Sequence, residues 1–132
     1  MPHPLPPYAL AVLEFPFPHL AALAGRAPIG GAREVALACF VAARLADDRR
    51  HDDNGIAPPA RTERSAGART WLGTLTIPAA VRAPLARCVD ATATAARSAV
   101  ARELAALSTA AAPYLDPSSR AELDALASVL AG

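Results

Sequence analysis

The stretch TIPAAVRAPLARCVDATATAARSAVARELAALSTAAA, residues 76–112, decides the fold. At about 100° per residue, its apolar side chains lie on one side of a helix and most of its charged side chains lie on the other. The apolar side carries Val81, Leu85, Cys88, Val89, Val100, Leu104 and Leu107. The spacing predicts one long helix, kinked or restarted near Pro84, whose apolar side must be covered by other helices.

Length and composition limit the choice of fold and of partner. The chain has 132 residues, enough for one domain whose core needs no metal or disulfide. Its formal charge is +1, and all thirteen of its basic residues are Arg. Because a nucleic-acid-binding domain is usually strongly basic, any contact with nucleic acid has to come from a local patch.

A second helix is predicted upstream, over residues 32–49. It begins after the Gly30–Gly31 pair, and its residues from Val35 to Ala43 are apolar on every face. A helix that is apolar all round is buried by its neighbours or by another subunit. We therefore expect a core helix, which also makes self-association a candidate property.

Two shorter helices complete the pattern. One covers residues 62–75, with Thr62 or Ser65 as its N-cap and Trp71 on its inner face. The other begins at Asp116–Pro117, where an N-cap residue precedes a proline at the first helical position. Its predicted buried residues are Leu123, Leu126, Ala127 and Leu130.

Residues 1–31 differ from the rest of the chain because they hold seven of its thirteen prolines. Proline fixes φ and lacks an N–H donor, so the short apolar runs here cannot extend into a long helix. We expect an irregular arm with one or two helical turns, its aromatic residues Tyr8, Phe15 and Phe17 lying on the bundle surface. The alternatives are a disordered arm and a segment that occupies a partner's groove.

These patterns together predict an all-α fold. We expect a small antiparallel four-helix bundle over residues 32–132, preceded by the irregular Pro-rich N-terminal arm over residues 1–31. No stretch of about eighteen apolar residues runs without proline or charge, so no membrane span is expected. The N-terminus lacks the features of a secretory signal, and a cytoplasmic location is the expectation.

The sequence has one concentration of carboxylates around a histidine, formed by Asp47, Asp48, His51, Asp52 and Asp53. On a helix Asp47, Asp48 and His51 share a face at a spacing that metal ligands use. A solvated charge run at a helix end, with Arg49 and Arg50 neutralising the aspartates, explains the same residues. Metal binding is the weaker interpretation, and no cofactor is expected.

The polar side of residues 76–112 supplies the candidate nucleic-acid contacts, which are Arg82, Arg87, Arg97 and Arg102. Arginine contacts phosphate readily, but acidic residues are interleaved with these four, so a solvated face is the alternative. Glu103 lies near the apolar side, and we expect it to pair with an Arg at the edge. Trp71 is either a core anchor or a platform for base stacking.

The remaining chemistry-bearing residues are Cys39 and Cys88, which stand in apolar helical patterns. Two buried thiols are expected, and a disulfide between them would need an oxidising compartment. The sequence contains no Gly-rich phosphate loop, nucleophile elbow or zinc-ligand spacing. We therefore expect a protein that is not an enzyme.

Three motifs carry a resemblance to a known family. AREVALACF (residues 32–40), TIPAAV (76–81) and the YL step at 114–115 occur in the order found in four-helix-bundle proteins of ribosomal RNA intervening sequences. The accessory variability determinant of diversity-generating retroelements belongs to the same group. Ala80 stands where the family's turn has Asn. The resemblance implies a ring-forming, non-catalytic bundle whose basic surface contacts RNA or a reverse transcriptase.

Three hypotheses about function follow. The first is a non-enzymatic interaction or assembly module that forms a homo-oligomer, or binds a protein partner, through the 32–49 helix or the arm. The second is an accessory protein that binds RNA or a reverse transcriptase through the Arg face. The third, and weakest, is a metal binder or small enzyme at the His51 cluster.

Overall fold

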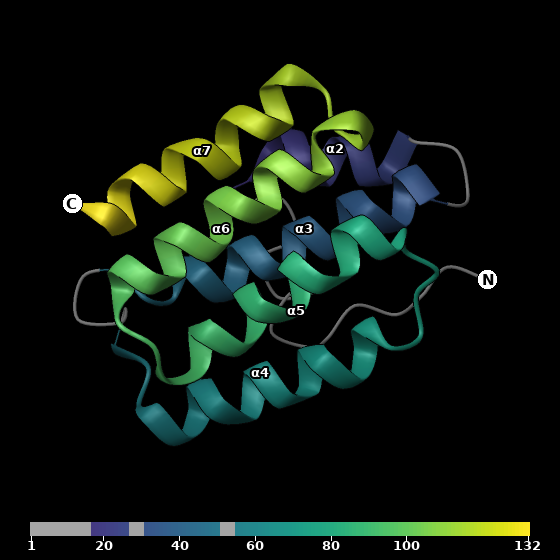
Figure 1. Cartoon of the computed structure of the whole chain (residues 1–132). Coiled ribbons are helices and arrows are strands. Elements are labelled where there is room, and N and C mark those ends of the chain that lie inside the picture. The colour runs from purple at the N-terminus through teal and green to yellow at the C-terminus, as the bar shows by residue number, and fades with distance from the viewer. Residues whose placement is uncertain (1–16, 27–30, 51–54) are drawn as a thin grey trace.

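The computed structural model describes residues 17–26, 31–50 and 55–132. Within these ranges the chain is all-α, with six α-helices and one short 3₁₀ helix (Figure 1). The helices are α2 (Pro18–Arg26), α3 (Gly31–Asp47), α4 (Pro58–Leu72), α5 (Ala79–Thr94), α6 (Arg97–Ala111), η2 (Ala112–Tyr114) and α7 (Pro117–Ala131). No helix in these ranges combines the length and the apolar character needed to cross a bilayer.

Helix α3 is the centre of the core. It packs against α2, α4, α5, α6 and α7. Its residues Val35, Cys39 and Val41 are inaccessible to solvent, as expected for a helix that is apolar on every face. The prediction of a buried core helix is confirmed. The helices that cover α3 belong to its own chain, so its apolar faces need no second subunit.

Helices α4 to α7 pack side by side in chain order, as Figure 1 shows. Buried polar contacts join neighbouring members of this series. The Ser65 hydroxyl of α4 donates to the carbonyl oxygen of Val89 in α5 at 2.8 Å. The Ser108 hydroxyl of α6 donates to a carboxylate oxygen of Asp124 in α7 at 2.7 Å. Such contacts fix the register of helices whose interfaces are otherwise made of Ala, Val and Leu.

The predicted single helix over residues 76–112 is wrong. It is two helices, because Ala95 and Ala96 have extended backbones with ψ of 159° and 153°. Neither glycine nor proline marks this break. A distant residue binds the chain at this point, since Arg49 donates to the carbonyl oxygens of Ala91 and Thr92, at 3.4 and 3.1 Å, where α5 ends. The break lets α5 and α6 both pack on α3.

The predicted count of four helices over residues 32–132 is also wrong, because the split of residues 76–112 gives five α-helices among the described residues there, and α2 in the arm is a sixth. Helix α2 packs on α3 and α7, and Phe17 and Leu20 belong to the core. The ring of Phe17 meets that of Phe40 edge-on, with centroids 6.5 Å apart. Phe17 is therefore buried rather than on the surface as predicted. Tyr8 and Phe15 lie outside the described residues.

A carboxylate from the last helix holds the start of α2. Glu122 in α7 accepts hydrogen bonds from the backbone N–H groups of His19 and Leu20, at 2.9 and 2.8 Å. The first N–H groups of a helix have no partner inside the helix, so an external carboxylate satisfies them and also favours the positive end of the helix dipole. This Glu122 clasp joins the two ends of the described chain.

Local signals explain the starts of both α7 and α4, but the signal at α4 is not the predicted cap. Asp116 caps α7 by accepting from the Ser119 N–H at 2.8 Å, which confirms the predicted start. Helix α4 begins at Pro58, earlier than expected, because Pro58 and Pro59 occupy its first turn, where a missing N–H costs nothing. Thr62 and Ser65 therefore both lie inside the helix, and neither caps it.

Candidate functional site

Two of the four predicted nucleic-acid contacts hold helices together. Arg82 in α5 donates to the carbonyl oxygens of Leu72 and Leu75, at 3.4 and 2.7 Å, which cap the end of α4. Arg87 in α5 pairs with Glu103 in α6, with 3.0 Å between Nε and Oε2. The expected pairing of Glu103 with an arginine is confirmed. Both guanidinium groups thus have structural partners within the chain.

The other two, Arg97 and Arg102, are exposed on α6. Neither forms a hydrogen bond or ion pair with the residues that the structure describes. Arg97 is the first residue of α6, and Arg102 lies five residues further along the same helix. The structure therefore separates the predicted set into a structural pair on α5 and a solvent-facing pair on α6.

Arginines surround Asp47 and Asp48 of the predicted metal cluster, whereas Asp52 and Asp53 lie outside the described residues. Asp47 lies 3.2 Å from Arg50 and 3.9 Å from Arg44, and Asp48 lies 2.8 Å from Arg64 of α4. Burial raises the pKa of the Asp48 carboxyl, and the Arg64 guanidinium opposes that rise. His51 lies outside the described residues. Within the described ranges, no group of three potential ligands from His, Cys, Asp and Glu comes together.

Trp71 and the two cysteines belong to the core. Trp71 is 8% exposed and packs with the buried residues of α4 and α5, as the core-anchor interpretation predicts. Cys39 and Cys88 are buried free thiols, as expected. Burial raises the pKa of the Cys39 thiol to about 12 and also raises that of Cys88. Both thiols are therefore protonated and unreactive at neutral pH.

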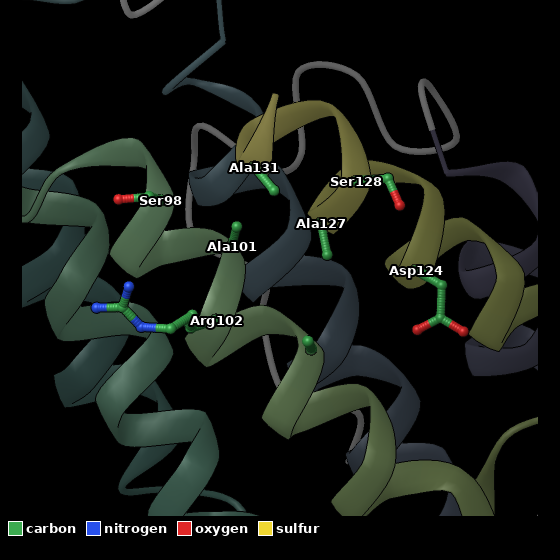
Figure 2. Close-up of a pocket in the computed structure, with 8 residues that line it drawn as sticks. Ser98, Ala101, Arg102, Asp124, Ala127, Ser128 and Ala131 are labelled. Atoms are coloured by element: carbon green, nitrogen blue, oxygen red, sulfur yellow. The ribbon is translucent and has the colours of Figure 1, made fainter.

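A groove with a volume of about 490 Å³ lies between α6 and α7. Its lining residues are small except for Arg102 and Asp124. The full lining is Ser98, Ala101, Arg102, Ala105, Asp124, Ala127, Ser128 and Ala131. Ala101 and Ala127 are buried at its floor, where the two helices face each other (Figure 2). Figure 2 also shows Arg102 on the α6 side and Asp124 on the α7 side. The groove thus has a small-residue floor between a cation and an anion.

The groove lies on a surface with few large apolar side chains. Val129 is the one large hydrophobic side chain exposed in the described ranges, at 47%. It lines a separate hollow of about 220 Å³, beside Phe17 and Leu126. A partner at either place would therefore rely on close backbone approach more than on burying Leu or Phe.

Sequence reasoning missed the groove and Asp124, although a signal for both exists. Ala101 and Ala105 are four residues apart on α6, as are Ala127 and Ala131 on α7. That spacing places each pair on one helix face, next to Arg102 on α6 and Asp124 on α7. Recognising the groove also requires knowing that these two faces meet.

Searches against protein-family models, curated proteins and solved structures found no match to this chain. The surface chemistry of the chain is therefore the basis for any statement about its role.

Proposed function

We propose that this protein is a non-enzymatic helical interaction module that associates with itself. Helices α4 to α7 would form an antiparallel array on one side of α3, and the module would present the outer face of α6 and α7. The observation that carries the proposal is the groove between α6 and α7, because it combines a small-residue floor with opposite charges on its two sides. Small side chains let a second helix approach closely.

The proposed route of self-association differs from the one that the sequence favoured. Helix α3 was expected to meet a second subunit, but its apolar faces pack against helices of its own chain. Helices α6 and α7 are the last two of this series (Figure 1), and the groove between them is lined by the exposed residues Ser98, Arg102, Ala105 and Asp124. They are therefore the better candidates for an intermolecular contact.

The uses of the charged residues support a non-enzymatic role. Glu122 and Asp116 bind helix N-termini, and Arg82 binds carbonyl oxygens where α4 ends. Glu103 and Asp48 pair with arginines. A catalytic acid or base needs access to a substrate and a pKa matched to its task. These groups are instead placed where they stabilise the helices.

Sedimentation velocity over a wide range of protein concentration tests the proposal. A self-associating module is expected to show a rise in average mass with concentration, ending at a closed oligomer. Light scattering on the same samples gives the mass independently of shape. A protein that stays at 13.5 kDa at every concentration would contradict the proposal.

A second candidate function is RNA binding through α6, favoured by the exposure of Arg97 and Arg102. The resemblance to the bundles of ribosomal RNA intervening sequences supports the same role. Two phosphate contacts predict that log K for single-stranded RNA falls with log salt at a slope of about −1.4. Retention of total cellular RNA at low and high salt measures this slope, with Arg97→Gln/Arg102→Gln as the matched variant. RNA retention that the double variant leaves unchanged would exclude this surface.

A further inference from the structure

Helix α2 is the shortest α-helix in the part of the chain that the structure describes. It has nine residues, whereas isolated helices shorter than roughly 12–15 residues are marginal in water. Leu20 and Ala24 of α2 are buried, as is Phe17 directly before it. The helix packs mainly on α3 and α7 (Figure 1), and α3 to α7 also pack on one another. Helix α2 can therefore detach while the other five helices keep their mutual contacts.

Charged side chains from two other helices bind the two ends of α2. At its start, Glu122 of α7 uses both carboxylate oxygens, Oε2 for the N–H of His19 and Oε1 for that of Leu20. At its end, Arg33 of α3 donates from Nη2 to the carbonyl oxygen of Gly25 at 3.1 Å. An anion at the start of a helix and a cation at its end both suit the helix dipole. The contacts to His19 and Gly25 are exposed, so water can replace either partner when α2 moves away.

The junction of α2 with α7 is incompletely packed. The hollow of about 220 Å³ lies here, lined among others by Phe17, Glu122, Leu126 and Val129. Side-chain atoms that line a hollow lose the contacts they would make in a close-packed interior. On its other side Phe17 meets the ring of Phe40 in α3. Helix α2 is thus held by a few apolar contacts and by the charged side chains at its two ends.

We propose that α2 is a latch, which opens and closes on α3 and α7 as one unit, and that Glu122 and Arg33 set the population of the closed state. Opening removes Phe17 from the ring of Phe40. It thereby makes accessible an apolar surface on α3 and α7 that the closed protein covers. The inference is independent of the proposed self-association, because it concerns contacts within one chain.

Native-state hydrogen exchange of the full chain at low urea concentrations tests whether α2 opens separately. We expect the amides of α2 to exchange at least about a hundredfold faster than the most protected amides of α3. Their exchange should depend little on urea, because opening one short helix exposes little surface. Amides of α2 that share both the rate and the urea dependence of α3 would overturn the latch, since α2 would then open only with the whole fold.

Glu122→Gln tests the contact at the start of α2. Gln has nearly the same shape but no charge and a single acceptor oxygen, whereas the two N–H groups use two. Because the Glu122 clasp is broken in the open state, exchange in α2 should become about tenfold faster. Glu103→Gln is the matched control. It removes the pair with Arg87 between α5 and α6, which persists when α2 opens, so exchange in α2 should not change.

Arg33→Gln tests the contact at the other end. Arg33 donates to one exposed carbonyl oxygen, so a smaller acceleration of exchange in α2, about threefold, is expected. Circular dichroism confirms that each variant is folded. Exchange in α2 that neither Glu122→Gln nor Arg33→Gln accelerates would overturn the latch. An acceleration that Glu103→Gln reproduces in full would overturn it as well, because α2 would then be reporting the stability of the whole fold.

Discussion

The connections from α4 to α5 and from α5 to α6 are each stabilised by an arginine, but the two arginines come from different parts of the chain. In each, an arginine donates to carbonyl oxygens at the end of the earlier helix. Arg82 serves the first connection from α5 itself, seven to ten residues away. Arg49 serves the second from the end of α3, more than forty residues away.

The difference shows to what extent each connection is determined by residues that are near it in the sequence. In the first connection Gly73 directly follows α4 and Pro78 directly precedes α5, so nearby residues mark both the end of one helix and the start of the next. The second has only Ala95 and Ala96, which have no preference for ending a helix. We therefore infer that a distant, buried side chain, Arg49, helps to end α5 at Thr94. The two turns should respond very differently to substitution.

The largest effect is expected from Arg49→Ala. Arg49 is 6% exposed, and its loss leaves the carbonyl oxygens of Ala91 and Thr92 without this donor in a buried place. We expect the free energy of unfolding to fall by about 3 kcal/mol, measured by urea denaturation. Arg69→Ala removes an exposed pair with Asp90 and serves as the control, with little expected change. A loss below about 1 kcal/mol for Arg49→Ala would show that the α5–α6 break is local after all.

Alkaline pH should lower the free energy of unfolding without any substitution, because α3, the helix that precedes Arg49, carries the buried thiol of Cys39. The thiol of Cys39 in α3 has a pKa of about 12 in the folded protein against 9.0 as its ordinary value. The unfolded chain therefore loses this proton first, and stability falls as pH rises from about 9 toward 12. Between pH 8 and 10.5 we expect Cys39 to cost about 2 kcal/mol.

The comparison of wild type with Cys39→Ala at both pH values isolates this contribution from other groups. The difference in unfolding free energy between the two proteins should shift in favour of the variant at the higher pH. An identical pH dependence in both proteins would be evidence against a buried thiol at this position.

A smaller effect is expected from Arg82→Ala at the first connection. Arg82 is only partly buried, and water can replace it at the carbonyl oxygens of Leu72 and Leu75. The local signal at Pro78 also remains. We expect a loss of about 1 kcal/mol by thermal or urea unfolding. A loss equal to that of Arg49→Ala would remove the distinction between the two connections.

The smallest effect is expected from Ala96→Pro, which adds a local signal to the second connection. Ala96 has φ of −63°, the angle that proline adopts, and its N–H donates no hydrogen bond to the residues that the structure describes. Ala95 is already extended, as the residue before proline must be. We expect a gain of about 0.5 kcal/mol.

A double variant, Ala96→Pro with Arg49→Ala, tests whether Arg49 stabilises the fold by ending α5. If Arg49 acts by ending α5, proline should stabilise the Arg49→Ala variant by more than it stabilises the wild type, because it replaces the lost stop signal. Purely additive effects would mean that Arg49 stabilises the fold through packing alone.

The same distinction between local and distant causes explains which predictions from sequence succeeded. Burial of α3 and the Asp116 cap follow from patterns within a few residues, and both are confirmed. The break at Ala95–Ala96 depends on Arg49, and burial of Phe17 depends on Phe40. Those contacts join elements that no local pattern brings together.

The candidate site follows the same rule. Helical periodicity placed Arg82 on the polar side of its helix. Periodicity does not reveal which other element of the fold packs next to that side. Arg82 turns onto the end of α4, whereas Arg102 faces solvent. The groove needs the faces of α6 and α7 to meet, so neither helix alone predicts it.

The Glu122 clasp has a consequence for the order in which the chain is made. The N–H group of Leu20 binds a carboxylate that lies 102 residues later. At roughly 5–20 residues per second, synthesis takes about 5 to 20 s to cover that interval. During that time α2 lacks the carboxylate that holds its first turn. The earliest described helix thus depends, during synthesis, on the last described helix, α7.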